Sequence, residues 1–321
     1  MLAVSAVSLS STDPLAGLQI GERPEPEPKD GWSIITMRTS SLNRHDLWSL
    51  KGVGLRPDQL PRILGCDGAG IDENGNEVVI HSIVTSPGWS GPDPLDPHRT
   101  MLSEGVDGTF AEKVLVPTHH LVPKPAQLSW SNAALCSVTL LTAYRMLFTQ
   151  AGLRPGDLVL IQGAGGGVNS AATQLAAAAG LRVWVTSRDE DRRLRALDLG
   201  AEQVFASGAR LPEKVDAVID NVGAATWSHS INVLRTGGTL VTCGATTGDP
   251  SKTELTKIFF RELRIHGSTA GTIGELRDLL AFVQATGIQP VIDQKLPLDQ
   301  ARKGFARMAA GDVFGNIVFN H

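Results

Sequence analysis

A glycine-rich run that follows an apolar stretch is the part of this sequence best suited to hold a charged ligand. Residues 158–161 are all apolar, four of the five residues from Gly163 to Gly167 are glycine, and a helix-like run of small and apolar residues follows. A strand that enters a helix through such a turn lets phosphate groups approach the backbone, where free helix N–H groups meet their negative charge. A second apolar run, 182–186, has the spacing of a βαβ unit. The sequence therefore predicts a dinucleotide pyrophosphate site made by Gly163, Ala164, Gly165, Gly166, Gly167 and Val168.

The residues at the end of the second apolar run indicate which dinucleotide binds. Proteins that prefer NAD usually carry Asp or Glu there, which accepts hydrogen bonds from the ribose hydroxyls. This chain has Ser187 and Arg188 instead. A hydroxyl and a guanidinium can hold a 2′-phosphate by charge-assisted hydrogen bonds, so we predict NADP(H) as the cofactor. The alternative is that Arg188 is one charge on the solvent-facing start of a helix.

The segment from Ser41 to Trp48 carries the candidate catalytic side chains. Asn43 and Asp46 are three residues apart, so on one helical turn both can face the same cleft. His45 lies beside Asp46 and is a candidate proton source, because imidazole titrates near neutral pH. The alternative for His45 is an exposed histidine on a helix surface.

Composition excludes several classes of partner. The 321 residues with 42% hydrophobic content suffice for two globular domains, and the net charge of −4 without a long basic run argues against nucleic acid or a membrane surface. No stretch approaches the ~20 apolar residues of a membrane span, and residues 1–10 are typical of a strand rather than a signal peptide. Cys66, Cys136 and Cys243 are far apart, as expected for free thiols in the cytoplasm.

Alternating apolar and helical stretches between residues 130 and 266 predict an α/β domain with a doubly wound, six-stranded parallel sheet. Ligands of such sheets bind outside the carboxyl ends of the strands. The clusters that follow two later strands are therefore candidate walls of the cofactor site, although ordinary turns would have the same composition. The candidates are Asn221, Val222, Cys243, Gly244 and Ala245. The six predicted strands are 158–161, 182–186, 203–205, 217–219, 239–242 and 263–266.

The rest of the chain differs in character. The first 125 residues show short β-type runs with frequent Pro and Gly, which predicts an irregular β domain interrupted by a polar loop at 86–100. One amphipathic helix at 273–286 and a closing strand near 315–319 complete the chain, and this strand is expected to return to the first domain. The predicted domains are 1–128 with 272–321, and 129–271.

Six segments together resemble the medium-chain dehydrogenase/reductases, which comprise zinc alcohol dehydrogenases and zinc-free quinone and enoyl reductases. The resemblance covers essentially the whole chain and implies a GroES-like domain, a Rossmann nucleotide-binding domain and commonly a homodimer. The edge strand 263–266 could pair with its copy. The matching segments are 41–48, 64–70 (Leu-Gly-Cys-Asp-Gly-Ala-Gly), 108–112, 141–144 (Leu-Thr-Ala-Tyr), 163–169 and 235–244.

Departures from the family pattern concern the metal. The three ligands of the catalytic zinc would fall at Asn43, Cys66 and Val138, of which only Cys66 can ligate, and the 86–100 loop has none of the cysteines of the structural zinc site. Cys136 lies two residues from the third position, which still leaves the site short. We therefore expect no metal, with Cys66 and Cys136 as small buried residues.

Other departures bear on the roles of single residues. Trp48 stands where many zinc-free members have a tyrosine proton donor, and Asn169 replaces a glycine that governs helix-to-strand packing, so a slightly displaced helix is expected. Asn316 replaces a basic residue, so one cofactor contact is expected to be missing. By the resemblance, Asn43 orients the substrate carbonyl, Asp46 fixes local structure, and a second reading of His45 is a hydrogen bond to the nicotinamide ribose.

The function expected from these observations is NADPH-dependent hydride transfer to a quinone or an α,β-unsaturated carbonyl without metal. The alternatives are an alcohol dehydrogenase with a degenerate metal site around Cys66, Asp67 and Cys136, and a catalytically decayed NADP(H)-binding regulatory protein. The expected partner is a small-molecule carbonyl compound.

Overall fold

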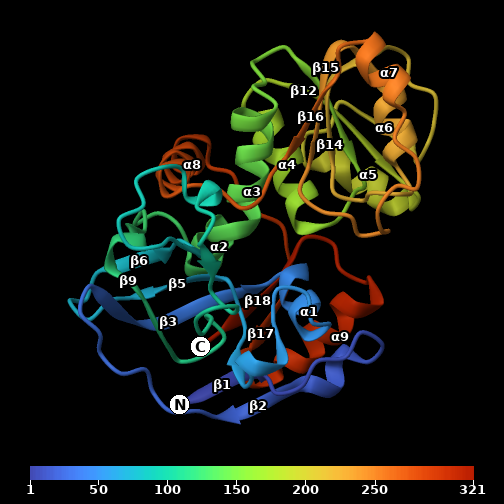
Figure 1. Ribbon diagram of the computed structural model, residues 1–321. Helices are drawn as coiled ribbons and strands as arrows, with labels where there is room; N and C mark the ends of the chain where they lie inside the picture. The colour runs from blue at the N-terminus through green and yellow to red at the C-terminus, as the bar shows by residue number, and fades with distance from the viewer. The chain divides into compact units, whose positions relative to one another are not determined.

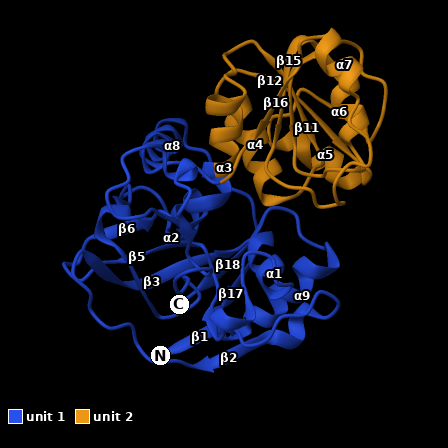
Figure 2. Cartoon of the chain, in the orientation of Figure 1, with its two compact units in different colours: residues 1–141, 270–321 blue, residues 142–269 orange.

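The computed structural model describes residues 1–321 and divides the chain into two compact units. Unit 1 comprises residues 1–141 and 270–321, and unit 2 comprises residues 142–269 (Figure 2). The sequence placed the boundaries after residue 128 and before residue 272, so the two divisions differ mainly at the first crossing. That crossing falls within a continuous helical stretch from Trp130 to Gln150, which includes two π-helical segments and has no sequence break.

Unit 2 is built around a six-stranded parallel sheet (Figure 1). The strand order β13-β12-β11-β14-β15-β16 reverses direction at β11, as in a doubly wound sheet, so the predicted architecture is confirmed. Every residue of β11 is buried, which is expected for a central strand covered on both faces. Its strands are β11 (Leu158–Gln162), β12 (Arg182–Ser187), β13 (Gln203–Ala206), β14 (Val215–Asp220), β15 (Leu234–Thr242) and β16 (Arg264–Gly267).

Short helices connect these strands. The longest, α4, follows the glycine-rich turn directly, and α5 begins with Asp189, whose carboxylate accepts the N–H of Arg192 at 2.9 Å. Trp184 is almost fully buried on one side of the sheet and packs against Phe205 with 5.3 Å between ring centroids. The helices of this unit are α4 (Gly167–Ala178), α5 (Glu190–Asp198), α6 (Trp227–Val233) and α7 (Leu255–Phe260), with α3 (Leu141–Tyr144) at the crossing.

Unit 1 is an irregular β structure with a seven-stranded sheet, a three-stranded sheet and a short hairpin. The long strand β3 is central to the larger sheet because it pairs with β5, β9 and the C-terminal strand β18. The strands are β1 (Leu2–Ala6), β2 (Leu18–Glu22), β3 (Trp32–Leu42), β4 (Arg62–Ile63), β5 (Asp67–Ile71), β6 (Glu77–Ile80), β7 (Ile83–Val84), β8 (Thr100–Met101), β9 (Lys113–Pro117), β10 (Leu121–Pro123), β17 (Ile292–Pro297) and β18 (Asn316–Asn320).

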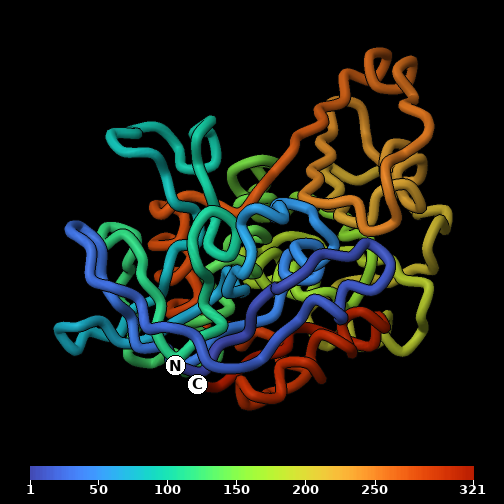
Figure 3. Tube along the Cα trace, turned by 60° about the horizontal axis from the view of Figure 1, so that its bottom comes forward, coloured from blue at the N-terminus to red at the C-terminus, as the bar shows by residue number.

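The C-terminal segment completes unit 1 as the sequence predicted. Strand β18 runs antiparallel to β3, and Phe319 packs edge-to-face on Phe110 with 5.1 Å between centroids. Phe305 joins this aromatic core from α9. Both termini belong to unit 1, where they lie near each other (Figure 1 and Figure 3). The helices are α1 (Arg44–Leu50), α2 (Trp130–Leu135), α8 (Ile273–Thr286) and α9 (Ala301–Ala310).

Helix α8 has the bounds that its amphipathic pattern predicted. Thr272 caps its start by accepting the N–H of Glu275 at 3.1 Å, and the Glu275 carboxylate accepts the N–H of Thr272 at 2.7 Å. Gly287 ends it with a left-handed φ of 70°. None of the helices in the chain combines the length and the apolar character that a membrane crossing requires.

Candidate functional site

The glycine-rich turn has the backbone geometry of a phosphate-binding loop. Gly163 and Gly165 adopt φ values of +88° and +100°, which side chains rarely tolerate. Gly166 is the N-cap of α4, and a side chain there would meet no atom within 4 Å, so the approach to the turn is open. The first N–H groups of α4 have no partner within the helix and lie at its positive end, so this turn can accept a pyrophosphate.

All four predicted cofactor segments lie at the carboxyl edge of the same sheet. The glycine turn follows β11, the Ser187–Arg188 pair ends β12, Asn221 and Val222 follow β14, and the 243–245 segment follows β15. These four strands are neighbours in one parallel sheet, so their carboxyl ends share one edge. The fold therefore brings together at one edge every residue that the sequence proposed for cofactor contact.

The end of β12 has one feature that the sequence did not single out. Arg193, in the first turns of α5, donates from Nη1 to the Ser187 carbonyl at 2.9 Å. The Ser187 hydroxyl accepts the N–H of Asp189 at 3.2 Å, and the Arg188 side chain is exposed. This turn is thus held by its own helix while one guanidinium stays available to solvent. The clue in the sequence was the Arg192-Arg193 pair that follows the acidic start of α5.

Buried polar side chains lie just beneath this edge. Gln162 donates to Ser230 Oγ at 2.9 Å and accepts the Thr186 hydroxyl at 2.6 Å, and Ser230 in turn donates to Asp220 at 2.6 Å. Asp220 also accepts the Thr226 hydroxyl at 2.8 Å. Each of these polar groups has a hydrogen-bond partner within the protein, so the strand ends are held in place without bound water.

In unit 1, Asn43 is clamped in a hydrogen-bonded cluster with Ser41, Asp67 and Thr139. Asn43 Nδ2 donates to Asp67 Oδ2 at 2.7 Å, and its Oδ1 accepts the Thr139 hydroxyl at 3.0 Å. The Ser41 hydroxyl donates to the same Asp67 oxygen at 2.6 Å. The second Asn43 N–H points to the Ser41 carbonyl at 3.4 Å, so the amide has few donors left to orient a substrate carbonyl. We call these four residues the Asp67 cluster.

Asp46 fixes local structure, as the resemblance implied, and does not face a cleft. Its side chain is fully buried, and its two oxygens accept the N–H groups of Asn43 at 2.8 Å and Gly65 at 3.0 Å. These bonds tie the start of α1 to the turn before Cys66. The expectation that Asn43 and Asp46 both face one cleft is wrong for Asp46, because its carboxylate satisfies backbone donors on the inside.

Burial changes the acidity of both aspartates. Loss of solvation raises the pKa of Asp67 to about 7, although Asn43 and Ser41 donate to it, and raises that of Asp46 to about 7 in the same way. The carboxyl groups are also close enough to disfavour each other's charge. Asp67 Oδ1 is buried and has no hydrogen-bond partner. A carboxyl group in this state carries a proton for much of the neutral pH range.

His45 lies on α1 with its ring in a polar niche. Its Nε2 lies 3.4 Å from Ser103 Oγ, 3.5 Å from Ser49 Oγ and 3.6 Å from Glu104 Oε1. Burial lowers the pKa of His45 to about 4, so the ring is uncharged at neutral pH. The side chain is only 24% exposed, so His45 is not the exposed surface histidine that the alternative interpretation predicted. Titration near neutral pH, the reason to consider it a proton source, does not hold for this environment.

The donor set does not fit a catalytic zinc ion. At the three ligand positions, Asn43 is engaged in the Asp67 cluster, Val138 is apolar, and the pKa of the Cys66 thiol is raised well above its usual value by burial and by Asp46 and Asp67. A catalytic zinc ion needs three protein ligands of the Cys, His, Asp or Glu type, and only one of these three positions has such a side chain. No group of three or more His, Cys, Asp or Glu side chains in the chain is arranged to hold a metal ion. Cys136 is buried as well, and its thiol points to the Asn132 carbonyl at 3.4 Å.

Three further residues, Asn316, Tyr144 and Asp96, make local contacts that stabilise the fold. Asn316 donates to the Val291 carbonyl at 3.0 Å between β17 and β18, which accounts for a buried amide at a position where a cofactor contact was expected to be missing. Tyr144 packs edge-to-face on Phe148 with 4.9 Å between centroids. In the 86–100 loop, Asp96 accepts the N–H groups of Ser86 at 2.6 Å and His98 at 2.8 Å, so a buried carboxylate organises this loop.

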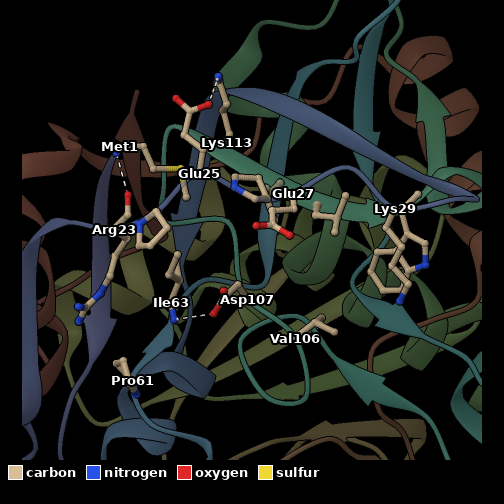
Figure 4. A pocket seen from close by; sticks show the side chains of 15 residues that line it. Met1, Arg23, Glu25, Glu27, Lys29, Pro61, Ile63, Val106, Asp107 and Lys113 are labelled. Atoms are coloured by element: carbon tan, nitrogen blue, oxygen red, sulfur yellow. Dashed lines mark hydrogen bonds and ion pairs between the residues drawn. The ribbon is translucent and has the colours of Figure 1, made fainter.

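A surface pocket of about 470 Å³ lies elsewhere in unit 1 (Figure 4). Its charged groups are largely paired within the protein: Lys113 with Glu25 at 2.5 Å, and Lys29 over the Trp32 ring at 4.0 Å. Asp107 accepts the N–H of Ile63 at 3.1 Å. No predicted site residue lines it, so this pocket is distinct from both candidate regions.

Comparison with known proteins matches both units. Residues 29–126 match the alcohol dehydrogenase GroES-like domain, and residues 167–285 match the zinc-binding dehydrogenase family. A zinc-type alcohol dehydrogenase-like protein of Schizosaccharomyces pombe is 31% identical over 90% of both chains. The chain belongs to the medium-chain dehydrogenase/reductase family. An acryloyl-coenzyme A reductase of Sulfurisphaera tokodaii is 30% identical over 95% of this chain and 97% of its own.

This medium-chain dehydrogenase/reductase also has a near neighbour among solved structures. A crystal structure of an NAD-dependent alcohol dehydrogenase superimposes with a TM-score of 0.92 at 33% identity and covers all of both chains. The predicted fold class and family are therefore confirmed. The protein is an enzyme of the oxidoreductase class, and its relatives carry names of two kinds, alcohol dehydrogenase and acyl-coenzyme A reductase.

Proposed function

We propose that this enzyme uses NADPH to reduce an α,β-unsaturated carbonyl compound, such as an enoyl thioester, or a quinone, without a metal ion. The observation that carries the proposal is the Asp67 cluster. Where a zinc-dependent relative needs ligands, this chain has an amide, a carboxyl group and hydroxyls that satisfy one another. The acryloyl-coenzyme A reductase among its relatives supports the substrate class.

The choice of NADPH rests on the end of β12. No acidic side chain stands at Ser187 or Arg188 to repel a 2′-phosphate, and the exposed Arg188 guanidinium is available to bind one. Arg193 holds the Ser187 carbonyl and thereby the turn that presents both groups. Asp189, Glu190 and Asp191 follow at once, but the Asp189 carboxylate is occupied as the helix cap. The glycine turn, the 221–222 pair and the 243–245 segment complete the proposed site.

The remaining chemistry falls to residues of unit 1. When bound, the reduced nicotinamide supplies a hydride to the β-carbon of the substrate. The charge that develops on the carbonyl oxygen then needs a hydrogen-bond donor. Asn43 is held by Asp67 and Thr139 and has few donors left, so we assign the donor role to uncharged His45. Asp67 and Thr139 act as positioning residues for Asn43.

The decisive test is turnover by the purified enzyme with NADPH or NADH, each offered crotonyl-coenzyme A, a simple enone and a quinone. We expect oxidation of NADPH with at least one acceptor, and a much lower rate with NADH. Elemental analysis of the same sample should find no stoichiometric zinc. Tight binding of NADPH without turnover of any acceptor would instead favour a catalytically decayed, NADP(H)-binding regulatory protein.

Alcohol oxidation with NAD is the second candidate. It is favoured by one observation, the full-length similarity to a structure named as an NAD-dependent alcohol dehydrogenase. This function would need a metal site formed by Cys66, Asp67 and Cys136. Burial raises the pKa of all three groups and so disfavours the charged forms that bind a metal ion. One bound zinc per chain, together with oxidation of alcohols by NAD, would support it over the first proposal.

We also propose that the enzyme acts as a homodimer through β16. This strand lies at one end of the sheet, so one row of its N–H and C=O groups has no neighbour within the chain. Ile265 on the strand and Leu255, Phe259 and Phe260 on α7 are exposed large apolar side chains, with Phe260 81% exposed. A two-fold copy would extend the sheet and cover this surface. Light scattering on the wild type and on Ile265→Lys should give a dimer and a monomer; a monomeric wild type would contradict it.

A further inference from the structure

Asn169 lies directly after the glycine turn, and its side chain fills the space beneath that turn. It belongs to the first turn of α4 and is 5% exposed. Its Nδ2 donates to the carbonyls of Gln162 at 2.9 Å and Gly163 at 2.8 Å. A Cβ on Gly163 would lie 3.2 Å from this nitrogen. The amide therefore supports the turn from inside, where a glycine would leave two carbonyls without this donor.

The other end of the Asn169 amide reaches the next strand. Its Oδ1 accepts from Asn221 Nδ2 at 2.8 Å, and Asn221 directly follows β14. Both donors and the acceptor of the Asn169 side chain are thus used in hydrogen bonds of 2.9 Å or less. A buried amide with this geometry has one orientation, because exchange of its oxygen and nitrogen would place acceptors against acceptors.

Asn221 also hydrogen-bonds residues of the loop that follows β15. Its carbonyl accepts the Thr246 hydroxyl at 2.7 Å, and its side chain hydrogen-bonds the Cys243 thiol, which partly offsets the burial that raises the pKa of that thiol to about 12. The next carbonyl, of Val222, accepts the Thr247 hydroxyl at 2.7 Å. The loops after β11, β14 and β15 are therefore linked by one chain of hydrogen bonds that begins at Asn169.

We propose that Asn169 is a positioning residue that fixes the pyrophosphate turn to the loops after β14 and β15, and so preorganises the cofactor site. The Asn169 side chain then strengthens cofactor binding, where the sequence predicted only a slightly displaced α4. This inference rests on the proposed binding of NADPH. It assigns the gain to lower flexibility of the three loops before the cofactor arrives, because Asn169 itself is buried and touches only the protein.

The test compares Asn169→Gly, Asn221→Ala and the double variant by calorimetric titration with NADPH. We expect Asn169→Gly to weaken NADPH binding on the order of tenfold, because about one to two net hydrogen bonds are lost. Asn221→Ala should weaken it less, and the double variant should be little worse than Asn169→Gly alone, because the two residues act through one bond. Asn169→Ala removes the same three hydrogen bonds without adding a glycine to α4, and it serves if Asn169→Gly does not fold.

Two further measurements separate positioning from general loss of stability. Thr173→Val is the matched control, since Thr173 donates to the Asn169 carbonyl at 2.9 Å on the same helix without touching the turn. It should lower the melting temperature but leave NADPH affinity unchanged. Adenosine 2′-monophosphate, which keeps the 2′-phosphate but lacks the pyrophosphate, should bind wild type and Asn169→Gly with similar affinity.

The outcomes divide clearly. If wild type binds NADPH and Asn169→Gly binds it equally well or better, the positioning role is overturned while the proposed function stands. If Thr173→Val weakens NADPH binding as much as Asn169→Gly does, the effect is general destabilisation of α4 and the inference is wrong. A wild type that does not bind NADPH overturns both.

Discussion

The carboxyl edge of the unit 2 sheet and the Asp67 cluster of unit 1 are built in opposite ways. At the sheet edge, backbone geometry dominates: positive φ at Gly163 and Gly165 and the free N–H groups of α4 present donors that no side chain supplies. In the Asp67 cluster, the strongest interactions are hydrogen bonds between the side chains of residues 41, 43, 67 and 139. The first arrangement depends on a backbone that stays accessible, and the second depends on each of its side chains.

This difference predicts which substitutions should affect cofactor binding and which should affect turnover. A backbone site is lost when a side chain obstructs it, whereas a side-chain cluster is lost when one partner is removed and another is left buried and unpaired. Changes at the sheet edge should therefore alter cofactor affinity, and changes around the Asp67 cluster should alter turnover or the response to pH.

The largest effect is expected from Gly166→Val. A Cβ built at this position would meet no atom within 4 Å, so the variant should fold normally. The added methyl groups would occupy the space through which phosphates approach the turn, and NADPH affinity should fall on the order of a thousandfold. Titration with NADPH and a melting curve measure the two properties.

A matched control exists in unit 1, where Gly21 of β2 also has open space for a side chain. Gly21→Val should change neither the melting temperature nor NADPH binding. Undiminished NADPH affinity in Gly166→Val would show that the turn does not hold the pyrophosphate. The description of the sheet edge as a backbone binding site would then be wrong.

The second prediction concerns His45→Ala. If uncharged His45 donates to the substrate oxygen, kcat should fall on the order of a hundredfold while the Kd for NADPH stays within about twofold. His98→Ala, at an exposed histidine of the 86–100 loop, is the control and should retain full activity. A large rise in the Kd for NADPH with little change in kcat would favour the other reading, in which His45 contacts the nicotinamide ribose.

Arg188→Ala should have a smaller effect that depends on the cofactor. Loss of one charge-assisted hydrogen bond should weaken NADPH binding about tenfold and leave NADH binding unchanged. Arg195→Ala, on a later turn of α5, is the control for a general change in charge. Equal weakening of both cofactors would mean that Arg188 acts through the fold or the overall charge, not through the 2′-phosphate.

The two regions also differ in how far the sequence predicts them. The strand, turn and helix around Gly163 are contiguous, so their pattern predicts the site without any long-range information, and all six strands of unit 2 appear within a few residues of the expected positions. The Asp67 cluster joins residues up to 98 positions apart, from Ser41 to Thr139. The sequence pointed to Asn43 but missed Ser41 and Thr139, because their contribution depends on the packing of a π-helical turn against β3 and β5.

The same limit explains the errors about His45 and Asp46. Their types suggested groups that titrate or face a cleft, but acidity depends on burial, which nothing in a seven-residue helix encodes. Asn169 illustrates the reverse case. It departs from the family pattern and was expected to displace α4, yet its amide is fully satisfied by residues from three separate segments.

The smallest effect is expected in the pH dependence of stability. Burial raises the pKa of Asp67 to about 7, so above the unfolded value of 3.8 the folded state retains a proton that the unfolded state has released. Stability from this group therefore falls as pH rises from about 4 to about 7. Asp67→Asn keeps an oxygen for the Ser41 and Asn43 donors but cannot ionise. The melting temperature of wild type relative to Asp67→Asn should drop by a few degrees across this interval.

Comparison with the variant is necessary because buried histidines change the stability with pH in the opposite direction to Asp67. The pKa of His120 is lowered to about 3 and that of His321 to about 4, so both stabilise the folded state more as pH rises toward 6.5. These contributions are the same in wild type and Asp67→Asn and cancel in the difference. A difference that stays constant with pH would mean that Asp67 ionises in the folded enzyme as it does in the unfolded chain, and the Asp67 cluster would then hold a buried carboxylate to which Ser41 and Asn43 donate.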